Sequence, residues 1–415
     1  MSRVLPVALA VLLVLCSPAA AFETGSSTSD SSSRNVESIV KPPGFNDTAS
    51  HLSVGKPGRT ATYTPSLDLG AALTMDRNEV QTQKRMSTLN ERLANAETRQ
   101  SKEQVLIRYT PELESQLSSL KHTERTISKR FNSSEMTTQQ YVRQLAILDA
   151  KARNIAHAID HLDSRGDTVP SFAPPVRRLR ADLYSLRGQV RQYATDRFRG
   201  QSAPRPIYVE TTNTGVILST IEGNQYVREA FRADYRKPSE AKALLVQRAA
   251  NITLSQYPWL NEHEKSPSTD YGAGVYPSVI PYSQGVVKPV LDSGTEKIFR
   301  ETQYKYLTGS NHIPYGTAVR NNSTSLNLTV NRTYPGGPLR INLTDASGDP
   351  VRGNISVGDT HVGQTGNDGV LWTVAPSRTF TVSATYDSET VNVTLAPYGM
   401  TPTNSTTSPP RNLKY

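Results

Sequence analysis

Apolar side chains recur every three or four residues through the first half of the chain, and this repeat is most regular between residues 141 and 162. Seven positions there share the pattern: Tyr141, Leu145, Leu148, Ala152, Ile155, Ile159 and Leu162. The alternating four-three spacing is a heptad seam, which a helix buries against a partner helix. We therefore expect an antiparallel helical bundle, or a folded-back coiled coil, over residues 73–200.

The boundaries of these helices are predicted from capping residues, prolines and glycines. Thr110–Pro111 has the pattern of a cap followed by a first-turn proline, which predicts a kink or a restart. Thr137 and Gln140 form a capping-box pattern at the start of the central helix. Residues 166–175 end that helix, and one further amphipathic helix is expected over residues 176–193.

The segment 205–310 changes to short apolar runs bounded by turn residues, which predicts an α+β domain with one main helix starting at Ser239. The expected strands are Ile207–Glu210, Val216–Ile221, Tyr226–Phe231, Val275–Ile280, Gly285–Leu291 and Lys297–Tyr306. Because proline cannot donate to a ladder, Pro277, Pro281 and Pro289 are expected to confine some of these runs to sheet edges or loops. The order of helix, strand, turn at Leu291–Thr295 and strand resembles the peptidase-associated PepSY fold. That resemblance implies a binding or inhibitory module.

Apolar and polar residues alternate with a period of two in the last quarter of the chain. Phe380, Val382, Ala384 and Tyr386 alternate with polar neighbours, and turn residues separate several such runs. This pattern predicts a β-sandwich of the Ig-like or prealbumin-like kind over residues 320–397. The runs DASGDPVRGNISV and GQTGNDGVLWTVAP resemble the carboxypeptidase-regulatory-like, prealbumin-type sandwich. The resemblance implies a spacer or adhesion module without an active site.

Residues 1–21 have the pattern of a secretory signal peptide, with Arg3, an apolar run and three alanines before Phe22. Cys16 is the only cysteine of the chain and lies within this leader. Cleavage after Ala21 would therefore leave an exported protein without disulfides or thiolate metal sites. Later apolar runs are too short to span a bilayer, so membrane attachment is expected only through an uncleaved leader.

Two further segments are predicted to be disordered because they contain few apolar residues. Residues 22–72 are rich in serine and are expected to form a spacer, and residues 398–415 are expected to form a tail. The chain as a whole resembles exported haloarchaeal proteins of unassigned function, through its leader, its heptad helices, the segments GVILSTIEGNQYVREAF and LDSGTEKIFRETQ, and the sandwich. The net charge of +9 departs from the acidic composition usual in that group.

This positive charge favours anionic partners, and part of it lies in the last predicted helix. Arg177, Arg180, Arg187 and Arg191 share a stripe beside the apolar seam of that helix. The stripe is either a solvated, ion-paired face or a surface that docks to an anionic polymer. Aromatic residues are not interleaved with these arginines, and the chain is expected to be exported, so nucleic acid is not an expected partner.

Asparagine sequons agree with export and cluster towards the C-terminus. The predicted glycosylation sites are Asn132, Asn321, Asn322, Asn327, Asn331, Asn342, Asn354 and Asn392. Since seven of these eight follow residue 320, we expect a glycan-bearing outer module on a secreted or cell-surface protein.

Candidate metal and catalytic groups are few, and no cofactor is expected. His157 and His161 have the spacing of a helical metal pair, but the heptad places both on the outward face. Glu262–Glu264 is expected to be a polar loop, and aspartates near the sandwich turns lack EF-hand spacing. The chain has no G-x-S-x-G, H-E-x-x-H or P-loop pattern.

The preferred interpretation is an exported, non-catalytic cell-surface protein that uses a helical rod and a sandwich to present a binding domain. Its partners are expected to be a surface protein, a glycan or an anionic polymer, with self-association possible through the helices. One alternative is a secreted regulator or inhibitor of a peptidase, acting through residues 205–310. A hydrolase of unrecognised type is a further alternative, because carboxylates from distant positions can meet in space.

Overall fold

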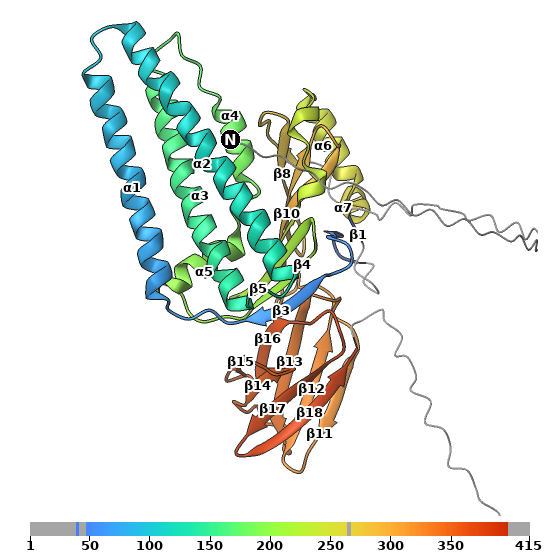
Figure 1. Ribbon diagram of the computed structural model, residues 1–415. Coiled ribbons are helices and arrows are strands. Elements are labelled where there is room, and N and C mark those ends of the chain that lie inside the picture. Colours follow the sequence, from blue (N-terminus) through green and yellow to red (C-terminus); the bar gives the residue numbers. More distant parts are fainter. Residues whose placement is uncertain (1–38, 41–46, 264–266, 397–415) are drawn as a thin grey trace, which may run out of the picture. The chain divides into compact units, whose positions relative to one another are not determined.

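The computed structural model describes residues 39–40, 47–263 and 267–396 (Figure 1). The predicted signal peptide at residues 1–21 and the predicted tail at residues 398–415 lie outside the described residues. The same is true of most of the predicted spacer before residue 47. All described residues belong to one unit of the chain, Glu37–Tyr415.

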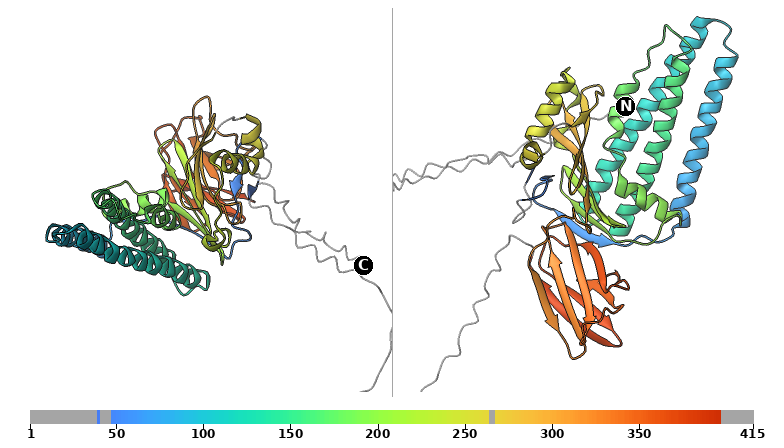
Figure 2. Two further views of the ribbon diagram at one scale, coloured as in Figure 1. Left: turned by 90° about the horizontal axis from the view of Figure 1, so that it is seen from above. Right: turned by 180° about the vertical axis from the view of Figure 1, so that it is seen from behind.

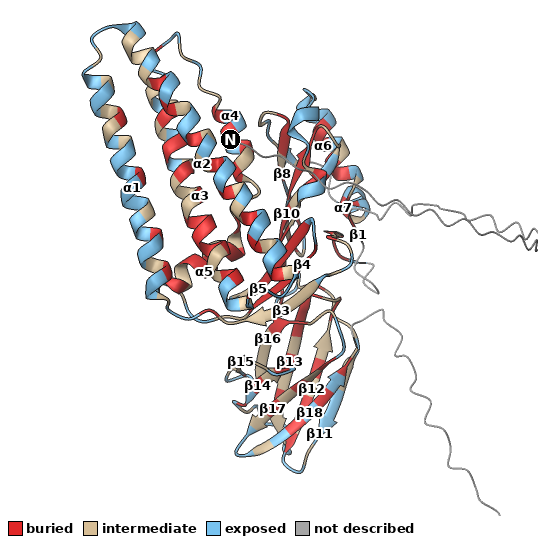
Figure 3. Cartoon of the chain, in the orientation of Figure 1, coloured by how far each residue is buried: buried red, intermediate tan, exposed pale blue. Residues whose placement is uncertain are grey.

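Three long helices and two short ones form the predicted bundle (Figures 1 and 2). They are α1 (Leu69–Ala94), α2 (Arg99–Asn132), α3 (Thr138–Gly166), α4 (Val176–Leu183) and α5 (Gln189–Phe198). Every residue of the predicted heptad seam is on α3 and is at most 4% exposed. Helix α3 contacts α1, α2, α4 and α5, which explains why its seam is the most regular of the chain. In Figure 3 it is largely buried, whereas α1 is largely exposed.

The predicted restart of the helix at Pro111 is wrong. Helix α2 runs through Pro111 without a restart, and the break lies before Arg99 instead. There the Thr98 hydroxyl accepts from the backbone N–H of Ser101, and the Ser101 hydroxyl accepts from that of Thr98. This capping box satisfies two donors that a helix start leaves unpaired, so the helix begins at that point. Burial of Tyr109 and Leu113 on either side of Pro111 holds α2 continuous despite its missing donor.

The bundle packs on one face of an eight-stranded antiparallel sheet, in the order β3-β4-β5-β6-β10-β9-β8-β7. The strands are β3 (Arg59–Tyr63), β4 (Ile207–Thr211), β5 (Gly215–Glu222), β6 (Gln225–Arg232), β7 (Ser268–Thr269), β8 (Val275–Tyr282), β9 (Gly285–Asp292) and β10 (Lys297–Tyr306). Ile207 and Val209 share the core of the helices, whereas Tyr208 belongs to another cluster on the opposite face. The sheet therefore has a bundle face and a second, opposite face.

The prolines in the middle segment interrupt the sheet less than expected. Strand β9 lies between β10 and β8 and keeps Pro289 opposite Glu301 of β10. On its other side, the β8–β9 pairing has a gap between Pro277 and Ile280. Pro289 lies within this gap and cannot donate a ladder hydrogen bond. The pairing of β8 with β9 is lost there and resumes on both sides.

The sheet's second face is crossed by residues 47–54, which we call the strap, and this part of the chain is not the flexible spacer that we expected. The strap contains β2 (His51–Leu52), which pairs with β1 (Ile39–Val40). Its backbone is held by side chains of the sheet: Gln303 donates to the carbonyl of Ser50 at 2.5 Å, and Arg228 donates to that of Leu52 at 2.7 Å. Ala49 and Leu52 are fully buried. These contacts offset the entropy lost on ordering a segment with few apolar residues.

Two short helices, α6 (Val246–Ser255) and α7 (Pro258–His263), share a buried cluster with the strap. The 3-10 turns Ala233–Tyr235 and Pro238–Glu240 precede them in the chain. The expected start of the main helix at Ser239 is wrong. Residues 241–245 are extended because Tyr276 bonds both the N–H and the carbonyl of Leu244, and Ser293 accepts from the N–H of Lys242. The helix begins once these side chains no longer bind the backbone.

The C-terminal module is a sandwich of two four-stranded antiparallel sheets, as predicted. Their orders are β11-β12-β13-β16 and β15-β14-β17-β18. The strands are β11 (Ala318–Asn322), β12 (Leu326–Arg332), β13 (Pro338–Asp345), β14 (Asn354–Val357), β15 (Thr360–Gln364), β16 (Val370–Val374), β17 (Phe380–Tyr386) and β18 (Glu389–Leu395). Strand β12 buries Leu326, Leu328 and Val330, so the alternation of apolar and polar residues is present near the start of the predicted range 320–397.

The contact between strap and sheet makes stability depend on pH through Lys305. Its ammonium donates to the carbonyl of Ala49 at 3.3 Å and is fully buried. Burial lowers the pKa of Lys305 to about 7, against the opposing effect of Glu301 and with a further lowering by Arg228. Between about pH 7 and its ordinary pKa, the unfolded lysine binds a proton that the folded one lacks. Stability should therefore rise with pH in that range, by up to about 1.4 kcal/mol per unit from this group.

Denaturant unfolding at pH 7.5, 8.5 and 9.5 measures this rise, and Lys305→Met should flatten it. The matched control is Lys102→Met on α2, which should keep the slope of the unaltered protein because Lys102 is not buried. A free energy of unfolding that is constant over these three values in the unaltered protein would contradict the account.

Candidate functional site

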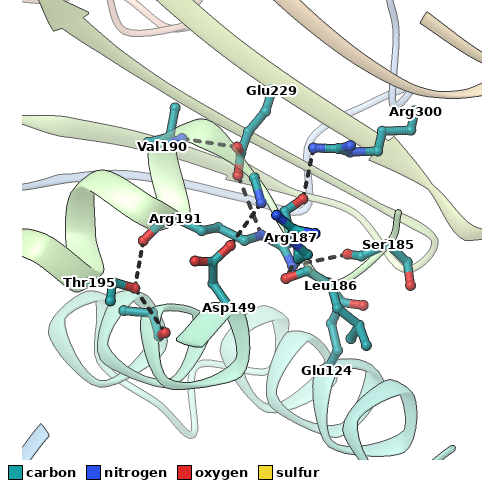
Figure 4. Close-up of polar contacts among 12 residues, drawn as sticks. Glu124, Asp149, Ser185, Leu186, Arg187, Val190, Arg191, Thr195, Glu229 and Arg300 are labelled. Carbon is teal, nitrogen blue, oxygen red and sulfur yellow. Dashed lines mark hydrogen bonds and ion pairs between the residues drawn. The ribbon is translucent and has the colours of Figure 1, made fainter. Parts of the chain in front are cut away.

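A buried arginine lies where the bundle meets the sheet. Arg191 of α5 is 3% exposed, and its guanidinium lies 2.7 Å from Glu124 of α2 and 3.4 Å from Glu229 of β6 (Figure 4). It also donates to the carbonyls of Ser185 and Leu186. The expectation that Arg191 belongs to an exposed stripe is therefore wrong. Its charge joins a helix of the bundle to a strand of the sheet.

Burial and charge act against each other in this group. Burial raises the pKa of Glu124 and of Glu229, and the charge of Arg191 lowers it in both. Burial likewise disfavours the charged form of Arg191, but the two carboxylates outweigh it and raise its pKa. Arg191 is thus held in its protonated form, and its charge favours the ionised form of both carboxylates.

Buried carboxylates also hold the linker between α4 and α5 and the first turn of α5, through hydrogen bonds from backbone N–H groups. Asp149 of α3 is fully buried, accepts from Arg153 at 2.7 Å and accepts from the N–H of Gly188 at 3.0 Å. Glu229 accepts from the N–H of Val190 at 3.0 Å and so caps the start of α5. A Cβ at Gly188 would lie 2.0 Å from a carboxylate oxygen of Glu229. The predicted single helix over residues 176–193 is therefore broken at this glycine, and Arg191 turns inward.

Beside these charges, a cavity of about 540 Å³ opens between helices α3–α5 and strands β8–β10; we call it the basic cleft. Its lining includes five cationic residues: Arg153, Arg180, Arg187, Lys288 and Arg300. Asp160 is the one carboxylate among the lining residues that the structure describes. The cleft therefore has a strong excess of positive charge.

The cations of the basic cleft differ in how far they are neutralised. Arg180 pairs with Asp160 at 2.7 Å and with Asp163 at 3.2 Å. Arg153 pairs with Asp149. Within the described part of the chain, no carboxylate lies within ion-pair distance of Arg187, Lys288 or Arg300. These three charges are available to a ligand.

Burial disfavours the charged forms of Arg187 and Arg300. It lowers the pKa of Arg187, and Arg153 lowers it further. Burial also lowers the pKa of Arg300, where Glu229 opposes this effect and Arg191 adds to it. Arg300 is fixed by donating to the carbonyl of Arg187 at 2.7 Å. An anion bound beside these guanidinium groups would favour their charged forms, against the burial of both and against the repulsion of Arg187 by Arg153.

The structure separates the four arginines that the sequence placed on one stripe. Arg180 and Arg187 line the basic cleft, Arg191 is buried beneath it, and Arg177 is exposed with its guanidinium 5.6 Å from the ring centre of Tyr271. Sequence reasoning missed Arg153, Lys288 and Arg300. The alternation of β10 carried a signal for Arg300, because Arg300, Thr302 and Tyr304 share one face of that strand.

The histidines and acidic residues form no metal centre among residues 39–40, 47–263 and 267–396, since no group of three potential ligands comes together there. His157 is exposed, as expected, whereas His161 of α3 contacts Asn90 of α1 at 2.9 Å. Asp345 accepts from the N–H groups of Ser347 and Asp349 and so closes a sandwich turn. Glu262 and His263 belong to helix α7, so the loop expected there is wrong, and Glu264 lies outside the described residues. No helix in the described part is long and apolar enough to cross a membrane.

The predicted glycosylation sites differ in their accessibility. Asn321, Asn322, Asn354 and Asn392 are exposed on the sandwich. Asn327, Asn331 and Asn342 are half-buried. The side-chain amide of Asn132 donates to the carbonyl of Thr212 at 2.7 Å and accepts from Thr211 at 2.5 Å. Since a glycan would replace one amide hydrogen, this contact between α2 and the sheet makes Asn132 the least suitable acceptor.

Family profiles match three consecutive parts of the chain. Residues 1–203 match a domain of unknown function (DUF7096), and residues 207–310 match a family of unknown function (DUF7094). Residues 317–393 match an archaeal fibronectin-III type-like domain. The sandwich resembles that archaeal module. No curated protein matches the chain.

These matches refine the resemblances found in the sequence. The match of the sandwich to an archaeal module supports the expected resemblance to archaeal proteins, and the sandwich is of the Ig-like class. The PepSY-like resemblance of residues 205–310 and the prealbumin-type resemblance of the sandwich are not confirmed. The three profiles divide the described chain into an N-terminal domain, a middle domain and a fibronectin-III type-like module.

Replacing the buried arginine should strongly destabilise the protein. Arg191→Met keeps most of the side-chain volume but leaves Glu124 and Glu229 buried without their partner, which should cost about 3–5 kcal/mol. Arg177→Met removes an exposed arginine and should change the free energy of unfolding by less than about 0.5 kcal/mol. Urea unfolding followed by circular dichroism measures both values. Equal stability of the two variants would show that the buried charges do not join bundle and sheet.

Proposed function

We propose that the protein is an exported, non-catalytic cell-surface protein that binds acidic polysaccharide through the basic cleft. The observation that carries this proposal is the convergence of Arg187, Lys288 and Arg300 on one cavity without carboxylate partners in the described part of the chain. Carboxylate and sulfate groups are the anions of such polymers, and guanidinium groups bind them through paired hydrogen bonds.

The cleft is suited to an anionic group more than to a neutral one. Burial already disfavours the charged forms of Arg187 and Arg300, so a bound anion would stabilise guanidinium groups that have lost part of their hydration. An incoming anion meets donors that are already oriented, since Arg300 is fixed by the Arg187 carbonyl and Arg153 by Asp149. Binding therefore loses little side-chain entropy.

Two features support the proposed location. Residues 1–21 have the pattern of an export signal. Asn321, Asn322, Asn354 and Asn392 are exposed sequon asparagines on the sandwich, so this module is suited to carry glycans outside the cell. In this proposal, the sandwich acts as an outward spacer, and the unit of bundle and sheet provides the binding site.

Binding of size-defined oligouronates and dextran sulfate, measured by isothermal titration calorimetry at 0.15 M salt, tests the proposal. Neutral dextran is the control ligand. The double variant Arg187→Gln with Lys288→Gln should bind the polyanions at least about tenfold more weakly, because each lost charged hydrogen bond contributes about 1.5–3 kcal/mol. Higher salt should weaken binding by the unaltered protein.

The matched control is Arg177→Gln, which removes one positive charge from α4 outside the cleft. It should retain nearly full affinity. Equal losses in the control and in the cleft variant would assign binding to net charge alone. No binding of either polyanion by the unaltered protein would remove the proposal.

A further inference from the structure

A second cavity, of about 420 Å³, lies on the face of the sheet opposite the bundle. Three separate parts of the chain line it: the strap with the residues that follow it, strands β4–β6 of the sheet, and two loops of the sandwich. The lining residues that matter for recognition are Lys56, Tyr208, Glu210, Arg228, Tyr334 and Arg378. Its volume is within the range of small-molecule sites.

A buried carboxylate lies in this cavity. Glu210 of β4 is 9% exposed and accepts from the hydroxyl of Tyr208 at 2.9 Å. No cation lies within ion-pair distance of it in the described part of the chain. Burial raises the pKa of Glu210, and the Tyr208 hydroxyl and the charge of Arg228 lower it. A carboxyl group with so few partners in a buried place has room for further hydrogen bonds from a ligand.

The neighbouring arginine, Arg228, already has partners within the protein. Arg228 lies 3.1 Å from Glu301 and donates to the carbonyl of Leu52 in the strap at 2.7 Å. It therefore forms a rigid positive side of the cavity and does not neutralise Glu210 directly. Lys56 and Arg378 are exposed and mark the opening.

Flat and apolar groups form the walls. Tyr208 and Tyr334 both line the cavity, and the ring of Tyr334 stacks on that of His51 with centres 5.2 Å apart. Gly336 lies so close to Tyr208 that a Cβ there would be 3.3 Å from the tyrosine ring. Val54 and Ile217 add apolar surface. Both tyrosines are almost fully buried, Tyr208 at 1% and Tyr334 at 2% exposed, so they form a fixed wall of the cavity.

We infer that this cavity binds a single pyranose sugar ring, with Glu210 accepting hydrogen bonds from its hydroxyl groups. A sugar ring has an apolar C–H face for the tyrosines and hydroxyl groups for the carboxyl and guanidinium groups. An amine ligand would be repelled by Arg228, Lys56 and Arg378, and the apolar walls would disfavour a polyanion. The inference is independent of the basic cleft, which lies on the other face of the sheet.

The test is saturation-transfer NMR with the full chain and the methyl glycosides of glucose, galactose, mannose, N-acetylglucosamine and glucuronate. At least one of them should bind with a dissociation constant in the millimolar range or tighter. Glu210→Gln keeps the shape of the side chain and should weaken that binding about tenfold, because hydroxyl groups lose acceptor sites. Ser377→Trp changes a half-buried residue of a lining loop and should abolish binding by filling the cavity.

Two controls keep the outcomes separate. Glu135→Gln alters an exposed glutamate on another part of the chain and should leave sugar binding unchanged. The double variant Arg187→Gln with Lys288→Gln should also leave sugar binding unchanged. The experiment therefore distinguishes loss of sugar binding in this cavity from loss of polyanion binding in the basic cleft. Thermal unfolding confirms that each variant is folded. The inference is overturned if no glycoside binds, if folded Glu210→Gln binds the glycoside as tightly as the unaltered protein, or if folded Ser377→Trp still binds it.

Discussion

The rest of the structure depends on one buried positive charge. Arg191 lies between a carboxylate of helix α2 and a carboxylate of strand β6. A buried arginine is tolerated when its charge and its donors are matched, and here Glu124, Glu229 and two backbone carbonyls do this. Because these partners come from the bundle, the linker and the sheet, none of the three can separate without leaving a buried charge unpaired. The helices are therefore one wall of a larger unit and not an independent rod.

The same arrangement explains the two cavities. On the bundle face, Asp149, Glu124 and Glu229 are used to hold Arg153 and Arg191, so Arg187, Lys288 and Arg300 have no carboxylate partner in the described residues. On the opposite face, Glu301 holds Arg228, and Glu210 is left with a tyrosine. The sheet thus separates an electropositive cleft from a small aromatic cavity. Each proposal concerns groups that the fold does not itself neutralise.

The sequence predicts those parts of the structure whose pattern is local. The seam of α3 can be read from the sequence because every third or fourth residue is buried against neighbouring helices. Strand β17 can be read from it because Phe380, Val382 and Ala384 alternate with polar residues. The strap is not predictable in this way, since its backbone is held by Arg228 and Gln303, far away in sequence. Arg191 lies on the same predicted stripe as Arg180 and Arg187, but the chain leaves the helix between Leu183 and Gln189, and Arg191 then pairs with Glu124 and Glu229. The boundary between the two family profiles likewise lies between α5 and β4, which share one core.

Native-state hydrogen exchange tests most directly whether bundle and sheet form one cooperative unit. The account predicts that the most protected amides of α3, α5 and β6 open with one common free energy and respond equally to added denaturant. The contradicting result is a bundle whose amides open at a clearly lower free energy than those of β6, which would show that the buried charges of Arg191, Glu124 and Glu229 do not hold the two together.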